Sequence, residues 1–479
     1  MSINIFKAKT EFKSDVKSNE YRLIGNNYFK NKHWFRSLLY FNKSIAYAHS
    51  KRALALGYGN RSAVYYHTNL FEECLENIQL ARDNGYAEQS KLDTREANCK
   101  QFMAKPKDEK SENLWDFFKL SYPANEKIPW LVDCVEMRRT KKYGRGIYAK
   151  QNLKAGDIIC VEEPLLHYTK GENGYYHCYN CFKAHKMNLI HCDHTASIMF
   201  CSTACKEHFN SKAIDEKEIV SADAKILSDV SEFFGGYKQF NDYINRTDLK
   251  KLNKSIFDYD FSDPTDPRYE ENRMNCLLSL CTNKLPIEIL SSIEKYISKK
   301  AVHHLLSLFW INSKNSALFD GKGIKFNTGF YVSLFTSLIN HACIGNAHIF
   351  VVEGKVITMI EKPVKAGDQI FECYPGCALI FNRSLKKDLE DQHLFNCDCH
   401  ACVRSEFMNM ADFKTGFTQA MKIDPTPIYQ QNYKVIKKTL QEARDDINDN
   451  PEDHKILSNS LIYTVTYMEA IGFQCMYPF

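Results

Sequence analysis

Grouped cysteines constrain this chain more than any other feature of its sequence. The chain has 18 cysteines among 479 residues. Two closely spaced pairs have the spacing of tetrahedral zinc ligands: Cys178, Cys181, Cys201 and Cys205. Further along, Cys397, Cys399 and Cys402 supply three ligands and need a fourth. Because these spacings occur on a chain with no signal-peptide pattern, we predict zinc thiolates in a reducing compartment rather than disulfides.

Length and composition set broad limits on the class of protein. A chain of 479 residues is too long for one core, and its length allows about three domains. Hydrophobic residues make up 44% and charged residues 25%, as in ordinary globular proteins. The net charge of +5 is weak for this length and does not argue for nucleic acid. The most apolar run, 305–311, is too short to span a bilayer.

A short repeat marks the first hundred residues. Gly25-Asn26 recurs as Gly59-Asn60, 34 residues later, and the apolar positions that follow keep helical spacing. This period is typical of tetratricopeptide helix pairs and predicts a helical region over 18–100. A plain helical hairpin with a chance repeat is the alternative. Two copies are few for a stable stack, so these helices are expected to pack on the rest of the chain or on partner proteins.

A polar pair at the end of an apolar run indicates a pocket. Residues 331–343 are rich in β-branched and aromatic side chains and end in Asn340, His341 and Cys343. Two strand-like pieces follow, joined at Glu353-Gly354, a hairpin signal. A later strand ends at Tyr374. We therefore expect the Asn-His pair and this tyrosine to share a pocket.

These motifs resemble the SET-and-MYND family of lysine methyltransferases. The family signature Asn-His-Ser-Cys-x-Pro-Asn is matched by residues 340–346, with Ala342 in place of Ser and Gly345 in place of Pro. Its later Cys-Tyr-Gly signature is matched by residues 373–376, where Pro375 separates Tyr374 from the glycine. The departures change the loop after each motif and leave the pocket residues in place.

The resemblance implies an α+β protein, with a β-rich SET fold split by a MYND zinc finger and flanked by helical regions. The expected order is a tetratricopeptide-like region at 18–100, a linker at 101–130, SET strands at 131–177, the finger at 178–219, a helical SET insert at 220–325, the SET core at 326–380, a post-SET zinc segment at 381–405 and a helical C-terminal region at 406–479.

The resemblance also implies a set of site residues. Tyr374 is expected to place its hydroxyl at the point of methyl transfer. Contacts to S-adenosylmethionine are expected from Gly144, Arg145, Gly146, Asn312, Asn340, His341, Tyr374 and Phe395. Asn315 is a rival to Asn312, and either could cap a helix. Phe395 is expected to stack on the adenine or to line the lysine channel.

The family's zinc layout implies about two zinc ions here. Cys343 is expected to complete the post-SET site. A MYND finger binds two zincs, but Thr195 stands where Cys192 should find a partner, and 215–218 replaces the later His and Cys. One intact finger site is therefore expected. Four histidines could rebuild the second site, although lone histidines are more often solvated or buried in a core: His185, His191, His194 and His208.

The implied function is transfer of a methyl group to a lysine of a histone or non-histone protein, in the cytoplasm and nucleus. The rival is a scaffold that binds partner proteins through its helices and finger. Sequence-specific binding to nucleic acid is not expected, because the finger lacks a recognition helix with base-reading spacing. No membrane association is expected.

Overall fold

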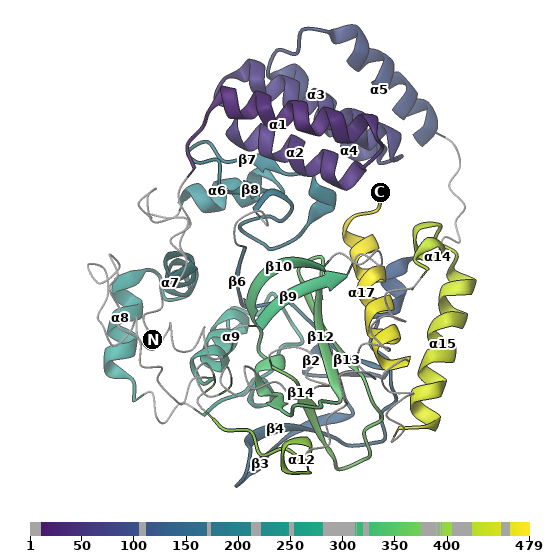
Figure 1. The fold of residues 1–479 in the computed structure, drawn as a ribbon. Coiled ribbons are helices and arrows are strands. Elements are labelled where there is room, and N and C mark those ends of the chain that lie inside the picture. Colours follow the sequence, from purple (N-terminus) through teal and green to yellow (C-terminus); the bar gives the residue numbers. More distant parts are fainter. Residues whose placement is uncertain are drawn as a thin grey trace. The chain divides into compact units, whose positions relative to one another are not determined.

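The computed structural model describes residues 11–104, 112–169, 174–211, 222–248, 253–280, 312, 314–319, 325–374, 389, 393, 395–404, 424–451 and 460–479. They fall into two compact units, shown in Figure 1. The helix–finger unit takes in Phe6–Asn113, Tyr168–Ala222 and Gln474–Phe479, and the sheet unit takes in Leu114–His167 and Asp223–Phe473. Pro375, residues 215–218 and the run 305–311 lie outside the described residues.

Five helices open the helix–finger unit: α1 (Asp15–Lys30), α2 (Trp34–Tyr47), α3 (Lys51–His67), α4 (Phe71–Asp83) and α5 (Gln89–Met103). Each packs on the next. Serine side chains begin two of them, because Ser14 accepts from the backbone N–H of Lys17 and Ser50 from that of Ala53. The predicted helical N-terminal region is confirmed.

The repeated Gly-Asn pair has a packing role. A Cβ at Gly25 would come within 2.6 Å of the Phe41 ring, and one at Gly59 would meet another aromatic ring at 2.5 Å. The two asparagines touch directly, since Asn60 Nδ2 donates to Asn26 Oδ1 at 2.8 Å. Small residues here let the helices approach closely, and this explains why the pair recurs.

The finger belongs to the same unit as these helices. Its elements are η3 (His185–Met187), β7 (Ile190–His191), β8 (Met199–Phe200) and α6 (Thr203–Ser211), and β7 pairs with β8 in antiparallel fashion. The last residues of the chain pack there too. The Tyr477 hydroxyl lies 3.3 Å from His177 Nε2, and its ring meets Phe35 edge-on.

A buried arginine joins the helices to the finger. Arg61, on α3, is fully buried. Its guanidinium donates to Asn77 Oδ1 at 2.7 Å, Asn42 Oδ1 at 2.6 Å, the Leu189 carbonyl at 2.6 Å and Asn188 Oδ1 at 3.1 Å. The first two acceptors lie on helices and the last two in the finger. The finger segment before β7 is thus held by side chains of the helical region.

The sheet unit is built on a curled sheet. Its strands are β1 (Ala124–Asn125), β2 (Ile128–Val132), β3 (Val135–Thr140), β4 (Gly144–Ala149), β5 (Ile158–Glu162), β11 (Asn340–His341), β12 (Ala347–Val352), β13 (Lys355–Ile360) and β14 (Gln369–Glu372). Their order is β1-β2-β5-β13-β12-β14-β4-β3, and β11 pairs with β14 (Figure 1). The predicted hairpin is confirmed, because Val352 pairs with Lys355 across Glu353-Gly354.

Smaller elements complete this unit. They are η1 (Leu114–Phe118), α7 (Ala222–Phe233), α8 (Tyr237–Arg246), η5 (Ile256–Asp258), α9 (Tyr269–Leu278), β9 (Lys314–Phe319), β10 (Lys325–Val332), η7 (Thr336–Leu338), α12 (His400–Arg404), α14 (Thr426–Tyr429), α15 (Tyr433–Asp449) and α17 (Ile462–Met476), while β6 (Leu166–Tyr168) crosses the boundary between the units. Together with the sheet, they confirm the predicted fold class.

Two expected boundaries differ from the observed elements. The insert at 220–325 is helical up to α9, but its last part forms the strand β9, which pairs with β10. Antiparallel pairing with the next strand overrides the helical pattern there. The expected linker at 101–130 contains η1, β1 and the start of β2. No helix among the described residues is long and apolar enough to cross a membrane.

A histidine between two carboxylates ties β12 to α17. His348 Nδ1 lies 3.2 Å from Glu361 and its Nε2 lies 3.2 Å from Glu469. Burial opposes the charged ring, but the hydrogen bonds to both carboxylates prevail and raise the pKa of His348 to about 10. The imidazolium therefore persists across the physiological range.

This contact predicts a pH-dependent stability. The stabilisation should be fully present below the ordinary pKa of histidine, about 6.5, and should fall away as the pH rises to about 10. His348→Gln should cost about 2 to 3 kcal/mol at pH 6, because it leaves two carboxylates without their cation. Urea unfolding of both proteins at pH 6, 8 and 10 checks this. A difference that stays constant over that range would contradict it.

Candidate functional site

Parallel pairing of a two-residue strand brings the residues of the predicted pocket together. Asn340 and His341 form β11, which pairs with Phe371 and Glu372 of β14. Tyr374 follows two residues after β14, and its backbone N–H donates to His341 Nδ1 at 3.2 Å. Its hydroxyl donates to the carbonyl of Ile339, the residue before β11, at 2.8 Å. The structure thus brings the Asn-His pair and the tyrosine together, as the sequence predicts.

A buried glutamate fixes the turn that leads into this pair. Glu162, at the end of β5, accepts backbone N–H groups of Leu334 at 2.9 Å, Phe335 at 3.0 Å and Thr336 at 3.1 Å. Burial raises the pKa of Glu162, while these hydrogen bonds act in the opposite direction. The sequence analysis missed this residue, because a single Glu at a strand end has no local signal.

Replacing Glu162 with glutamine should lower the free energy of unfolding by about 2 kcal/mol, because the amide group can no longer accept from all three N–H donors. Glu163→Gln is the matched control, since its neighbouring side chain is exposed. Chemical denaturation of both variants is the measurement. Equal stabilities would show that the carboxylate does not support the turn.

The predicted glycine loop lies against the same residues. Gly144 has a φ of +62°, which favours glycine. A Cβ on Gly146 would lie 2.2 Å from Gln369 Nε2 and 2.8 Å from Asn340 Nδ2, so a larger residue would displace these two amide groups. Asn340 Nδ2 donates to the Arg145 carbonyl at 2.7 Å. The backbone of this loop therefore reaches the pocket.

The Arg145 side chain contacts the insert. Its guanidinium donates to the carbonyls of Lys254 at 3.2 Å and Ser279 at 2.7 Å. Burial lowers the pKa of Arg145. The side chain of Arg145 is thus engaged with the insert, and its backbone is the part that could make a contact with the cofactor. That contact stays a prediction. The same holds for Asn312, which lies two residues before β9, and the side chain of its rival Asn315 lies outside the description.

The departures from the family signature have structural reasons. A Cβ at Gly345 would lie 2.9 Å from the Phe371 carbonyl oxygen and 3.2 Å from Cys373 N, so the loop passes too close to β14 for a larger residue. Ala342 is buried in an apolar cluster around Cys343, where a small side chain fits.

His341 connects the pocket to a cysteine cluster. Burial lowers the pKa of His341 to about 4, so the ring is neutral at physiological pH. Because Nδ1 accepts from Tyr374 N, the remaining proton lies on Nε2, which is 3.4 Å from Cys343 Sγ. The His341 ring therefore links Cys343 to Tyr374, so a displacement of the Cys343 sulfur would be transmitted to the tyrosine through this ring.

Aromatic rings gather around Tyr374. His341 lies 5.4 Å from its ring and Phe395 lies 6.4 Å away in an edge-on arrangement. The ring of His393 lies at 4.7 Å. Burial raises the pKa of Tyr374, so its hydroxyl stays protonated at physiological pH. The predicted residue Phe395 is thus placed beside Tyr374 and His341.

A lysine that the sequence analysis did not single out also reaches this group. Lys314, the first residue of β9, forms an ion pair with Glu372. Its Nζ donates to the Thr336 carbonyl at 3.2 Å and lies 5.3 Å from the centroid of the Tyr374 ring. The sequence around Lys314 did not indicate this contact, because the segment was expected to be helical and instead forms a strand that pairs with β10.

The post-SET cysteines and Cys343 converge. Cys343 Sγ lies 3.8 Å from Cys397 Sγ and 3.4 Å from Cys402 Sγ, and its N–H donates to Cys399 Sγ at 3.4 Å. All four sulfurs lie within 4.8 Å of one another. Sulfurs around a tetrahedral zinc with Zn–S bonds near 2.3 Å are about 3.8 Å apart, so the four thiols fit this metal.

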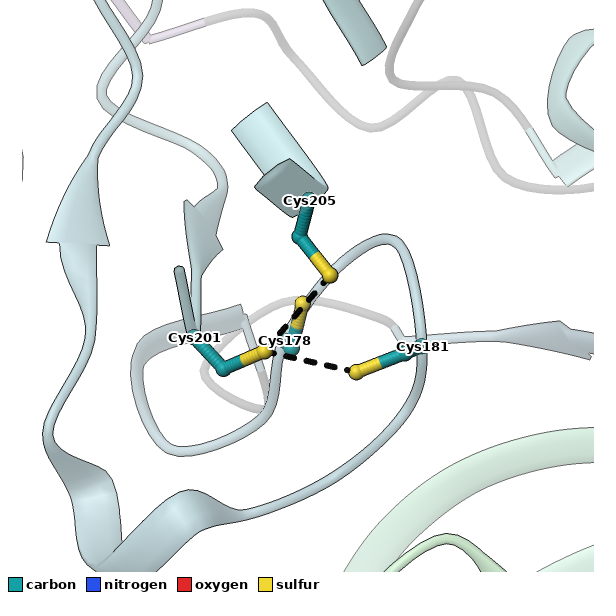
Figure 2. Close-up of side chains that lie close together, drawn as sticks. All are labelled: Cys178, Cys181, Cys201 and Cys205. Atoms are coloured by element: carbon teal, nitrogen blue, oxygen red, sulfur yellow. Dashed lines mark hydrogen bonds between the residues drawn. The ribbon is translucent and has the colours of Figure 1, made fainter. Parts of the chain in front are cut away.

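The finger cysteines make a second group of the same kind. Figure 2 shows four side chains that point toward one another: Cys178, Cys181, Cys201 and Cys205. Cys201 Sγ lies 3.5 Å from Cys181 Sγ and 3.6 Å from Cys205 Sγ. Hydrogen bonding from Cys178 lowers the pKa of Cys201 to about 4 and that of Cys205 to about 6, so these sulfurs become thiolates, the form that binds zinc.

The second finger site is remodelled. Cys192 is fully buried, and the Thr195 hydroxyl donates to the Glu11 carbonyl at 3.0 Å. His191 Nδ1 lies 3.0 Å from the Tyr58 hydroxyl. Within the described ranges, potential ligand atoms gather only in the two four-cysteine groups, and these include none of the four histidines considered above. A single finger zinc agrees with this arrangement.

Known proteins share sequence similarity with the part of the chain that contains this site. The SET domain matches residues 144–375, which contain the glycine loop, the Asn-His pair and Tyr374. The chain is 26% identical over 216 residues to the protein-lysine N-methyltransferase SMYD4 of Danio rerio, covering 41% of this chain and 28% of that protein. It is 23% identical over 293 residues to the human histone-lysine N-methyltransferase SMYD3, covering 60% of this chain and 65% of that protein.

The chain carries a SET domain and is similar to SMYD4 and SMYD3. A protein named methyltransferase from Gibberella zeae is also similar, at 21% identity over 310 residues, covering 62% of this chain and 35% of that protein. In each of these three cases the match spans less than two thirds of the relative's length. The described residues contain two four-cysteine groups, and the loop at Gly345 lies against β14.

Proposed function

We propose that this SET-and-MYND protein is a protein-lysine N-methyltransferase that uses S-adenosylmethionine. The observation that carries the proposal is the hydrogen bond from Tyr374 N to His341 Nδ1, on a ring that also faces Cys343. It supports the proposal because His341 contacts both Tyr374 and Cys343, which belongs to a four-cysteine group. The names of the relatives support the same reaction.

The residues around β11 suit the proposed cofactor. The backbone of the glycine loop and the Asn340 side chain meet where Gly146 leaves no room for a side chain, as close approach to a ligand requires. Phe395 offers a ring that can stack on a base. When bound, S-adenosylmethionine would supply a methyl group activated by its sulfonium charge.

The residues of the pocket orient and desolvate the acceptor amine. Aromatic rings around Tyr374 exclude water and disfavour the ammonium form of a lysine, whose ordinary pKa is about 10.4. The protonated Tyr374 hydroxyl is held by the Ile339 carbonyl and adds a fixed dipole at the proposed point of transfer. Most of the acceleration is expected from this positioning.

Calorimetric titration with S-adenosylmethionine tests the proposal without a known substrate. The wild-type protein should bind, and Asn340→Ala should abolish binding because it removes the hydrogen bond to the glycine loop. Tyr374→Phe should still bind but should lower methylation of a pool of lysine-containing proteins by about 100-fold or more. Failure of folded, zinc-loaded protein to bind would favour a scaffold that acts through partner proteins.

A further inference from the structure

Lys314 is a buried amine beside Tyr374 that the proposed reaction does not use. Only about 11% of its side chain is exposed. Its Nζ faces Glu372, the Thr336 carbonyl and the ring of Tyr374. Among the described lysines, this is the one whose ammonium lies over that ring. An acceptor lysine that enters a pocket built around Tyr374 would meet the same three groups.

The surroundings of this amine suit a nucleophile as well as a cation. Burial lowers the pKa of Lys314 to about 7, whereas the nearby Glu162 carboxylate raises it. The ion pair with Glu372 favours the ammonium form, but burial has the larger effect and keeps the pKa of Lys314 well below that of an exposed lysine. A substantial fraction of neutral amine is therefore present near neutral pH, where an exposed lysine is almost fully protonated.

The side chain of Lys314 also has a structural role, because its ammonium balances the buried carboxylate of Glu372. Lys314 begins β9 and pairs through its backbone with Tyr331 of β10. An apolar side chain at this strand position would leave Glu372 buried without a cation, and a lysine directed to solvent would leave the Thr336 carbonyl without this donor. The side chain is instead directed into the group of residues around Tyr374.

We propose that Lys314 is an acceptor lysine within the chain itself, a site of intramolecular methylation beside Tyr374. This inference rests on the proposed methyltransferase function. The lone pair of Nζ attacks the sulfonium methyl of S-adenosylmethionine and forms an N–C bond. The C–S bond breaks with its electron pair remaining on sulfur, which gives the neutral thioether S-adenosylhomocysteine. The new ammonium then passes a proton to solvent.

Mass spectrometry of the whole protein after incubation with S-adenosylmethionine tests this directly. We expect a gain of one or more methyl groups that maps to the peptide containing Lys314. Lys314→Arg keeps the ion pair with Glu372 but should lose the gain. Lys355→Gln, which changes an exposed lysine at the start of β13, should keep it. The rate per molecule should not change over a tenfold dilution, because the reaction is intramolecular.

Calorimetry provides a readout that does not depend on turnover. Lys314→Gln removes a cation next to the proposed position of the sulfonium and leaves Glu372 to attract it. It should therefore tighten binding of S-adenosylmethionine by about threefold or more while leaving the neutral S-adenosylhomocysteine unchanged. Equal effects on both ligands would overturn the placement of Lys314 at the point of transfer.

The outcomes separate this inference from the function beneath it. Protein that binds S-adenosylmethionine but gains no methyl group at Lys314, or gains it at a rate that rises with protein concentration, overturns the inference and leaves the methyltransferase proposal standing. Protein that does not bind S-adenosylmethionine overturns both.

Discussion

Replacing Cys343 with serine should reduce the zinc content from about two ions per chain to about one and should abolish binding of S-adenosylmethionine. Cys343 belongs to the four-sulfur group and also faces His341 Nε2. Structural zinc contributes about 10 kcal/mol or more to folding in small zinc domains, so loss of one thiolate should release the segment at 397–402. His341 would then lose the contact that orients it against Tyr374.

The measurement is elemental analysis of zinc alongside calorimetry. Cys373→Ser is the matched control, because Cys373 packs against the same apolar cluster but is not one of the four sulfurs. It should retain about two zinc ions. A Cys343→Ser protein that keeps both its zinc and its affinity for the cofactor would show that the cluster does not support the pocket.

Replacing Arg61 with methionine should destabilise the helix–finger unit by about 3 to 5 kcal/mol. The change removes four hydrogen bonds and leaves their acceptors buried, including Asn42 Oδ1 and the Leu189 carbonyl. The finger segment between its two cysteine pairs is anchored there. We therefore expect zinc to leave the group of Cys178 more readily as well.

Urea unfolding and the rate of zinc transfer to a chelator are the two measurements. Arg52→Met is the matched control, since this arginine lies on the same helix with its side chain exposed. It should change the stability by less than about 0.5 kcal/mol. An Arg61 variant that unfolds and releases zinc like the wild type would mean that the helices do not hold the finger.

The parts of the site with local signals could be predicted from sequence. The spacing of the cysteines identifies the finger group, because ligands close in sequence must lie close in space. The hairpin at Glu353-Gly354 follows from turn chemistry, since both residues have positive φ. The link between Cys343 and the post-SET cysteines joins distant segments and was available only through the family resemblance.

The residues that sequence analysis missed act through long-range contacts. Glu162 caps a turn more than 170 positions away, and Lys314 meets Glu372 across 58 positions. Arg61 lies on a helix where an arginine is ordinarily expected to face solvent. In each case the local pattern is ordinary and the partner is supplied by tertiary structure, so no window of sequence contains the information.

Contacts between early and late segments determine when each unit can be completed during synthesis. Tyr477 lies against His177, 300 positions earlier in the chain, within the unit that also contains the first helices. Cys343 likewise cannot contact Cys402 until that later residue has been synthesised. A ribosome-bound chain can form α1 to α5 early but cannot close either unit until its last segments have emerged. We therefore expect His177 to lack its contact with Tyr477, and Cys343 to lack its partner sulfurs, until those later segments have been made.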